Sequence, residues 1–106
     1  MRLVIIESPY AGDVAANEAY ARRCVAHSLS LGEAPIASHL LYTQPGILDD
    51  SKPDERRKGI AAGHAWMPRA DAVAVYTDRG ISEGMKRGIE WASELGTPVE
   101  FRTLDE

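Results

Sequence analysis

The chain has 106 residues, which is enough for one domain with a single hydrophobic core. Apolar residues make up 44% of the sequence, so a disordered chain is excluded, and Ala, with 15 copies, is the commonest of them. Because 16 acidic residues outnumber 12 basic ones, the charge argues against a polymeric nucleic acid as partner.

Cysteine usage and the N-terminal residues narrow the class of protein further. Cys24 is the single cysteine, so the chain forms no internal disulfide, and no His, Asp or Glu spacing resembles a metal site. We therefore predict neither a metal ion nor another cofactor. Only residues 3–6 are continuously apolar before Glu7, too few for a signal peptide or a membrane span. We expect a soluble cytoplasmic protein with no membrane partner.

The first half of the chain alternates between strand and helix patterns. Residues 3–6 form a short apolar run that is typical of a strand buried on both faces in a parallel sheet. A helical period follows over residues 14–31, and Gly32 is a natural C-terminal stop. Residues 35–38 predict a second strand, and residues 39–50 predict a long surface loop, a kind of segment that is often functional.

The second half repeats the alternation. Ser51 resembles a helix cap, and the predicted helix runs to residue 66 or 67. Its predicted inner stripe is Arg57, Ile60, Ala61, His64 and Met67. The remaining predicted elements are a strand at 72–76, a helix capped by Ser82 and ended by Gly96, and a strand at 99–101.

This alternation predicts an α/β fold, because parallel strands joined by helices bury both faces of their sheet. We expect one domain over residues 1–106, built as a three-layer αβα sandwich of flavodoxin-like or Rossmann-like type. Its four-stranded parallel sheet is expected to have the strand order 2-1-3-4.

Polar residues follow the ends of the predicted strands, where α/β sheets bind their ligands. Glu7 is the least expected of them, since an ionised carboxylate at the end of an apolar strand needs a partner or a raised pKa. Either it hydrogen-bonds Tyr10 or nearby amides, or it is a general base or nucleophile. Asp78 has the same two interpretations, a turn residue or a catalytic carboxylate. The candidate catalytic residues are Glu7 and Asp78, and the candidate binding residues are Ser8, Tyr10, His39, Tyr42, Ser82 and Gly84.

Two of these binding residues also have structural interpretations. The Ser82 hydroxyl can cap its helix, or the amides of Glu83 and Gly84 beside it can hold an anion such as phosphate. His39 can hydrogen-bond a loop, or it can orient a base or a sugar.

Short motifs along nearly the whole chain resemble the nucleoside 2-deoxyribosyltransferase-like superfamily, in particular small bacterial and phage proteins. The resemblance implies binding of nucleosides or their 5′-monophosphates, and cleavage of the N-glycosidic bond by a glutamate nucleophile. The motifs are Ser8-Pro9-Tyr10-x-Gly12-Asp13, a helix with Asn17, Pro35-x-x-Ser38-His39, Ala70-Asp71-Ala72-Val73, Ser82-x-Gly84-Met85 and Ala92-x-x-x-Gly96-x-Pro98-Val99.

The glutamate position of the superfamily pattern Ser-x-Gly-x-x-x-Glu-x-x-x-Ala falls on Gly88, which has no nucleophile. Glu90 lies two positions away, on the outer helix face, and is expected to be solvated. Our first hypothesis is therefore a protein that binds a nucleoside, a nucleotide or a related ribosylated molecule. Ser8 and Tyr10 would line one side, His39 and Tyr42 the base end, Asp78 the sugar, and Ser82 a phosphate.

Two alternatives remain open. The chain can be an active N-glycosidase or 2-deoxyribosyltransferase that uses Glu7 or another carboxylate, or a non-enzymatic interaction protein with a vestigial pocket. Large apolar side chains at Trp66, Met67 and residues 40–42 also predict a homodimer, because a domain of this size has difficulty covering them. The resemblance implies the same, since members of the superfamily often complete their pockets from a neighbouring subunit.

Overall fold

The computed structural model describes residues 1–104 and has a four-stranded, all-parallel sheet as its middle layer. The strand order is β2-β1-β3-β4, so the predicted order is confirmed. The prediction of one domain over residues 1–106 includes residues 105 and 106, which lie outside the described residues. The strands are β1 (Leu3–Glu7), β2 (Ala34–Ile36), β3 (Ala72–Tyr76) and β4 (Val99–Arg102). The helices are α1 (Val14–Ser30), α2 (Ser38–Leu41), α3 (Pro53–Trp66), the 3₁₀ turn η1 (Met67–Arg69) and α4 (Glu83–Leu95).

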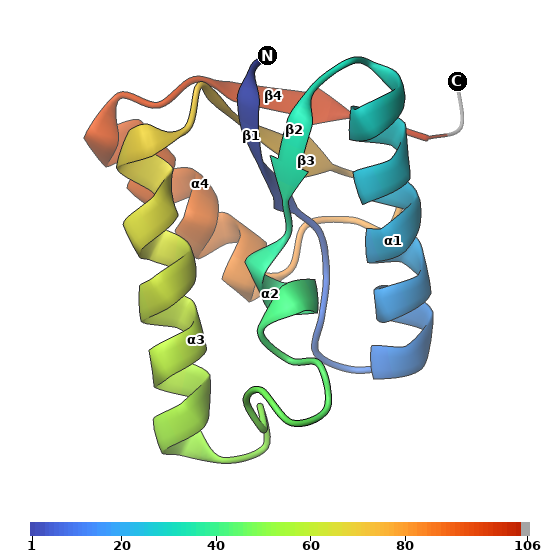
Figure 1. Cartoon of the computed structure of the whole chain (residues 1–106), viewed down its shortest axis with the longest axis vertical. Helices are drawn as coiled ribbons and strands as arrows, with labels where there is room; N and C mark the ends of the chain where they lie inside the picture. The colour runs from blue at the N-terminus through green and yellow to red at the C-terminus, as the bar shows by residue number, and fades with distance from the viewer. Residues whose placement is uncertain (105–106) are drawn as a thin grey trace.

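Helices cover both faces of the sheet, as the predicted three-layer sandwich requires (Figure 1). On one face, α1 packs Tyr20 and Cys24 against Val4, Ile6 and Ala74 of the two central strands. The opposite core combines side chains of β1 and β3 with those of η1 and α4. Its buried members are Ile5, Val73, Val75, Met67, Met85 and Ala92.

The segment after β2 differs from its prediction. The second strand ends at Ile36, and residues 38–41 form the short helix α2 instead of the start of a loop. This turn forms because Leu40 packs against the core under α1, while the Thr43 hydroxyl donates to the His39 carbonyl at 2.7 Å. Ser51 does not cap the next helix, because its hydroxyl donates to Asp49 at 2.6 Å and Lys52 takes the N-cap position.

The inner stripe predicted for α3 is correct only at its end, where Met67 is buried and His64 packs on Trp91. Arg57, Ile60 and Ala61 are exposed, and no residue of α3 is fully buried. The helix packs on α2 and η1 instead of lying flat on the sheet, so its apolar stripe finds no sheet to cover. Gly59 and Gly63 face the packed side: a Cβ atom would lie 3.2 Å from Leu48 Cδ1 at the first position and 3.0 Å from Ser38 Cβ at the second.

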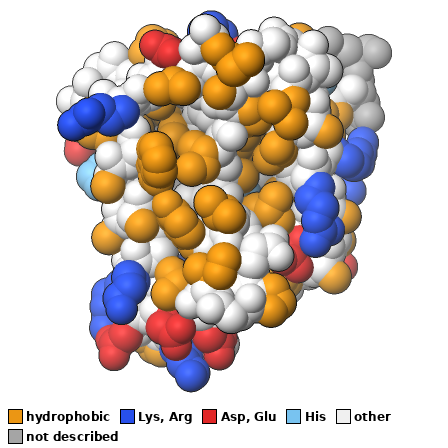
Figure 2. All heavy atoms as spheres, in the orientation of Figure 1, with side chains coloured by type: hydrophobic (Ala, Val, Ile, Leu, Met, Phe, Trp, Pro, Cys, Tyr) orange, Lys and Arg blue, Asp and Glu red, His pale blue; other side chains and the backbone are white. Residues whose placement is uncertain are grey.

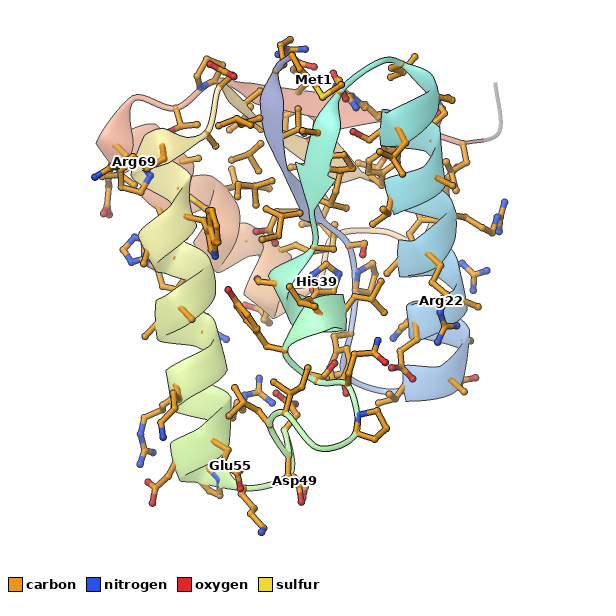
Figure 3. The ribbon with its side chains drawn as sticks, viewed as in Figure 1. Met1, Arg22, His39, Asp49, Glu55 and Arg69 are labelled. Carbon is orange, nitrogen blue, oxygen red and sulfur yellow. The ribbon has the colours of Figure 1, made fainter. Side chains whose placement is uncertain are left out.

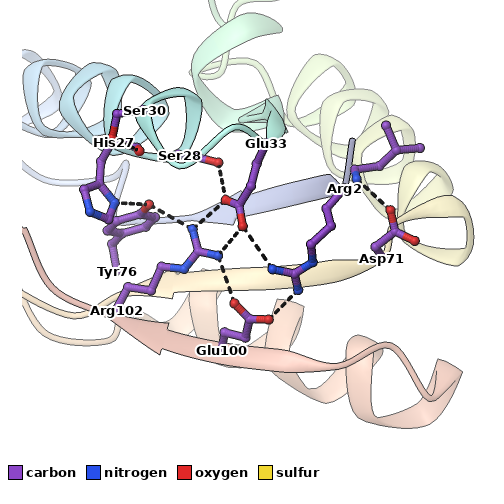
Figure 4. Close-up of polar contacts among 10 residues, drawn as sticks. Arg2, His27, Ser28, Ser30, Glu33, Asp71, Tyr76, Glu100 and Arg102 are labelled. Atoms are coloured by element: carbon purple, nitrogen blue, oxygen red, sulfur yellow. Dashed lines mark hydrogen bonds and ion pairs between the residues drawn. The ribbon is translucent and has the colours of Figure 1, made fainter.

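A charged cluster links the segments at the two outer strands (Figure 4). Glu33, which directly precedes β2, is buried and accepts two hydrogen bonds from Arg102 of β4, each at 2.8 Å. Arg2 donates to the same carboxylate at 3.0 Å, and both arginines also pair with Glu100. Arg102 above all lowers the pKa of Glu33 to about 2. The cluster lies apart from the site described below.

Within residues 1–104, no helix is long and apolar enough to cross a membrane.

Candidate ligand-binding site

A cavity of about 390 Å³ opens at the carboxyl ends of the strands, where α2, α3 and α4 approach one another. It brings together one predicted catalytic residue and all the predicted binding residues, although they come from three separate segments. Figure 3 shows one of them, His39, near the middle of the molecule, with Glu55 of the cavity wall at the start of α3. The predicted residues that line it are Glu7, Ser8, Tyr10, His39, Tyr42, Ser82 and Gly84.

Asp78 is not brought into this cavity. Its carboxylate accepts a hydrogen bond of 2.6 Å from the Tyr20 hydroxyl and bonds of 3.0 and 3.1 Å from the Leu104 amide. Tyr20 belongs to α1, so Asp78 turns toward the α1 side of the sheet and joins the C-terminal residues to that layer.

Glu7 and Gly88 lie against each other across the cavity wall. A Cβ atom added at Gly88 would lie 2.5 Å from Oε2 and 2.7 Å from Cδ of Glu7. The carboxyl group of Glu7 therefore fills the space into which a side chain at position 88 would extend. Burial raises the pKa of Glu7 to about 8, so the carboxyl group is largely protonated at neutral pH.

Ser8 and His39 form the next polar pair of the cavity. The Ser8 hydroxyl and His39 Nε2 share a hydrogen bond of 2.6 Å. Burial lowers the pKa of His39 to about 4, so the imidazole is neutral under physiological conditions. Ser8 fixes the orientation of the ring, and the pair brings no charge to the cavity.

The N-terminus of α4 forms another part of the wall. The Ser82 hydroxyl accepts a hydrogen bond from the Met85 amide at 3.3 Å, and Met85 Sδ accepts one from the Ser82 amide at 3.4 Å. Ser82 therefore caps its helix as predicted, and it also lines the cavity.

Sequence reasoning predicted Tyr42 as a cavity residue but missed two further rings of the cavity wall, His64 of α3 and Trp91 of α4, which stack with ring centroids 4.3 Å apart. Trp66 lies outside the lining, and its indole donates to the Tyr42 hydroxyl at 2.8 Å. Trp91 lies three residues after Gly88, on the same helix face, and this spacing was the available signal. His64 could not be found, because its role depends on how α3 stands beside α4.

A metal ion has no evident ligand set among the residues described. Within residues 1–104, no group of three or more His, Cys, Asp or Glu side chains is arranged to hold one. The polar groups described above, the protonated Glu7 carboxyl group and the Ser8–His39 pair, are uncharged and lie in the cavity wall together with aromatic rings.

Solved structures with this fold include enzymes that act on nucleosides and nucleotides. A 2-deoxyribosyltransferase from Bacillus psychrosaccharolyticus is 14% identical and has a TM-score of 0.68 over 95% of this chain and 72% of its own. A Clostridium botulinum CMP N-glycosidase, 14% identical, has a TM-score of 0.56 over 96% and 69%. A 2-desoxiribosyltransferase from Leishmania mexicana, 17% identical, has a TM-score of 0.62 over 99% and 66%.

The predicted resemblance is thus confirmed as a likeness of fold, the nucleoside 2-deoxyribosyltransferase-like fold. No curated protein sequence matches the chain. A family model matches residues 2–102, which is most of the sequence. The chain therefore belongs to the family described as a domain of unknown function, DUF7768.

Proposed function

We propose that the cavity at the strand ends binds a nucleoside or a nucleotide. The observation that carries the proposal is the meeting of all six predicted binding residues in one cavity of about 390 Å³. This volume lies within the range of small-molecule pockets, about 300–1,000 Å³. The proposal is further supported by the similarity of the fold to enzymes of nucleosides and nucleotides.

In this proposal, the base packs against the aromatic side chains of Tyr42 and Trp91, because a flat heterocycle gains from stacking on such rings. Ser8 and His39 supply uncharged hydrogen-bonding groups beside it. A 5′-phosphate, where the ligand has one, lies near Ser82 and Gly84 at the start of α4, since amides at a helix N-terminus favour an anion.

The test is a binding screen with the four common nucleosides, their 2′-deoxy forms and their 5′-monophosphates. We expect at least one of them to raise the melting temperature, and His39→Ala to weaken its binding at least tenfold. Glu90→Gln on the outer face of α4 is the control and should bind as the wild type does. If no compound shifts the melting temperature even at millimolar concentration, the chain is better explained as an interaction protein with a vestigial pocket.

The contact between Glu7 and Gly88 favours a second candidate function, cleavage of the N-glycosidic bond. In its ionised form, which is the minority form below the pKa of about 8, the Glu7 carboxyl group can replace a carboxylate carried by position 88, because it fills the space next to that position. We expect Glu7→Gln to abolish release of free base, measured by chromatography, while binding persists. Unchanged release in this variant would exclude Glu7 as the catalytic group.

A double variant tests the relocation itself. Combining Glu7→Ala with Gly88→Glu returns a carboxyl group to the helix and clears the space that it needs. If relocation explains the glycine, this variant should release base faster than Glu7→Ala alone. Equal rates in the two variants would contradict the relocation.

We also propose that the chain forms a homodimer. Figure 2 shows hydrophobic side chains gathered over the middle of the face that carries β2, α2 and α3. Leu3, Leu41, Ile47 and Trp66 are each about half exposed, which is unfavourable in water unless a partner covers them.

A further inference from the structure

Among residues 1–104, the partly buried Glu7 differs from the buried Glu33 in having no donor group to balance its charge. Within residues 1–104, no hydrogen bond or ion pair reaches the Glu7 carboxyl group, whereas Glu33 is held by two arginines. Glu7 ends the central strand β1 and contacts Gly88, which contributes neither a side chain nor a charge. The cavity is therefore the direction in which its carboxyl group can find a hydrogen-bond partner.

The other charged and titratable groups of the cavity do not supply the missing partner of the Glu7 carboxyl group. His39 is neutral and hydrogen-bonded to Ser8. The two arginines of the cavity, Arg56 and Arg87, are exposed, and Arg56 pairs with Asp50 at 3.6 Å. The charged and titratable residues that line the cavity beside Glu7 come from four places. They are Tyr10 before α1, His39 and Tyr42 at α2, Asp50, Glu55, Arg56 and His64 from the next loop and α3, and Glu83 and Arg87 from α4.

An uncharged carboxyl group is therefore the stable resting form, and it differs from a carboxylate in what it recognises. A carboxylate only accepts hydrogen bonds, whereas the protonated group donates one and accepts others. An anionic oxygen of a ligand would also accept this hydrogen bond, as a charge-assisted one. A nitrogen or carbonyl oxygen of a heterocyclic base matches the donor.

We propose that Glu7 donates a hydrogen bond from its protonated carboxyl group to an acceptor atom on the base of the ligand, and that the site thereby selects bases that present an acceptor atom at this position. This inference rests on the proposed binding of nucleosides or nucleotides. It assigns Glu7 a part in specificity whether or not a bond is cleaved. A phosphate on the ligand then lies toward the exposed mouth of the cavity, away from Glu7.

The experiment is a calorimetric titration with adenosine and cytidine, whose bases do not titrate over the range used. Loss of the proton above the pKa of Glu7 should weaken wild-type binding about tenfold between about pH 7 and pH 9. Gln resembles the protonated carboxyl group in shape and donor capacity, so Glu7→Gln should bind within a few-fold of the wild type with no such pH dependence. Glu90→Gln, the matched loss of an exposed carboxylate, should keep the wild-type pH dependence.

A second readout keeps the inference testable if Glu7→Gln does not fold. The carboxyl carbon of Glu7, followed by ¹³C NMR in the wild type, should titrate near pH 8, and its titration should move to higher pH when adenosine or cytidine binds.

The outcomes separate this inference from the proposed function. Nucleoside binding that stays constant or tightens as the pH rises through 8 would overturn the donor role of Glu7 and leave the binding proposal standing. Absence of binding at every pH, in the wild type and both variants, would overturn the proposed function and this inference together.

Discussion

At the scale of single residues, Glu7 makes the stability of the protein depend on pH. Its pKa is about 8 in the folded chain against an ordinary value of 4.5, so the folded state holds an extra proton between these values. The free energy of unfolding therefore decreases as the pH rises from about 4.5 to about 8. Glu7→Gln removes this decrease.

We predict that the Gln variant gains on the order of 2 kcal/mol over the wild type between about pH 5 and pH 8.5, an amount reduced by water at the cavity mouth. Urea unfolding at several pH values measures the difference. The low pKa of His39 acts in both proteins and cancels from it. Glu90→Gln is the control, and a Glu7→Gln difference that stays constant with pH would contradict a raised pKa.

The sequence singled out Glu7 and Gly88, but it did not predict how the candidate site residues contact one another. Glu7 stood out because a carboxylate rarely ends an apolar strand, and Gly88 because it occupies a motif position. Their contact could not be predicted, since it depends on how closely α4 packs on β1. Glu7 is the last residue of β1, whereas Asp78 lies in the loop two residues after the end of β3, and it turns toward Tyr20, a choice of face that local sequence does not encode.

At the scale of elements, Gly63 sets the distance of α3 from α2, and Gly59 sets its distance from the loop that carries Leu48. Gly63→Ala places a methyl group against Ser38, 3.0 Å from its Cβ, whereas Gly59→Ala meets only the end of the flexible Leu48 side chain at 3.2 Å. Both changes gain up to about 1 kcal/mol of helix propensity.

We predict that Gly63→Ala nevertheless lowers the free energy of unfolding by about 1 kcal/mol, while Gly59→Ala leaves it equal or higher. Thermal unfolding of the two variants decides the matter, and equal stabilisation by both would contradict close packing at Gly63.

The cluster around Glu33 yields a second prediction at this scale. Arg102→Gln leaves a buried carboxylate with its main partner removed, so we expect a loss of about 3 kcal/mol in the free energy of unfolding. Glu100→Gln, at a partly exposed position, should cost less than about 1 kcal/mol. Denaturant unfolding near neutral pH measures both. Equal losses of unfolding free energy in the two variants would contradict the prediction that the burial of Glu33 makes the loss of Arg102 the more costly change.

Helix and strand patterns predicted every strand of the sheet and the three long helices, because hydrophobic periodicity and caps are local properties. The short helix α2 and the packed face of α3 were missed for one shared reason. Both depend on contacts between these two segments, and glycines at the contact replace the apolar stripe that a helix on a sheet would show.

At the scale of the whole molecule, the strand order was predicted together with the flavodoxin-like or Rossmann-like fold type, and the structure confirms it. The exposed apolar face over β2, α2 and α3 leads to a prediction about assembly (Figure 2). Light scattering at micromolar concentration should give about twice the chain mass of 11.6 kDa. Leu41→Glu should return the mass to that of one chain, and Leu29→Glu on α1, also exposed, should not. A wild-type mass of 11.6 kDa would contradict the dimer.

The central claim is that the cavity lined by Glu7, His39 and Trp91 holds a nucleoside or a nucleotide. A crystal structure after soaking with the compound that most raises the melting temperature tests it most directly. The account predicts the base in this cavity, stacked on an aromatic ring, with one of its acceptor atoms within hydrogen-bond distance of the Glu7 carboxyl group. A ligand bound elsewhere, or a cavity that stays empty at saturating concentration, would contradict the account.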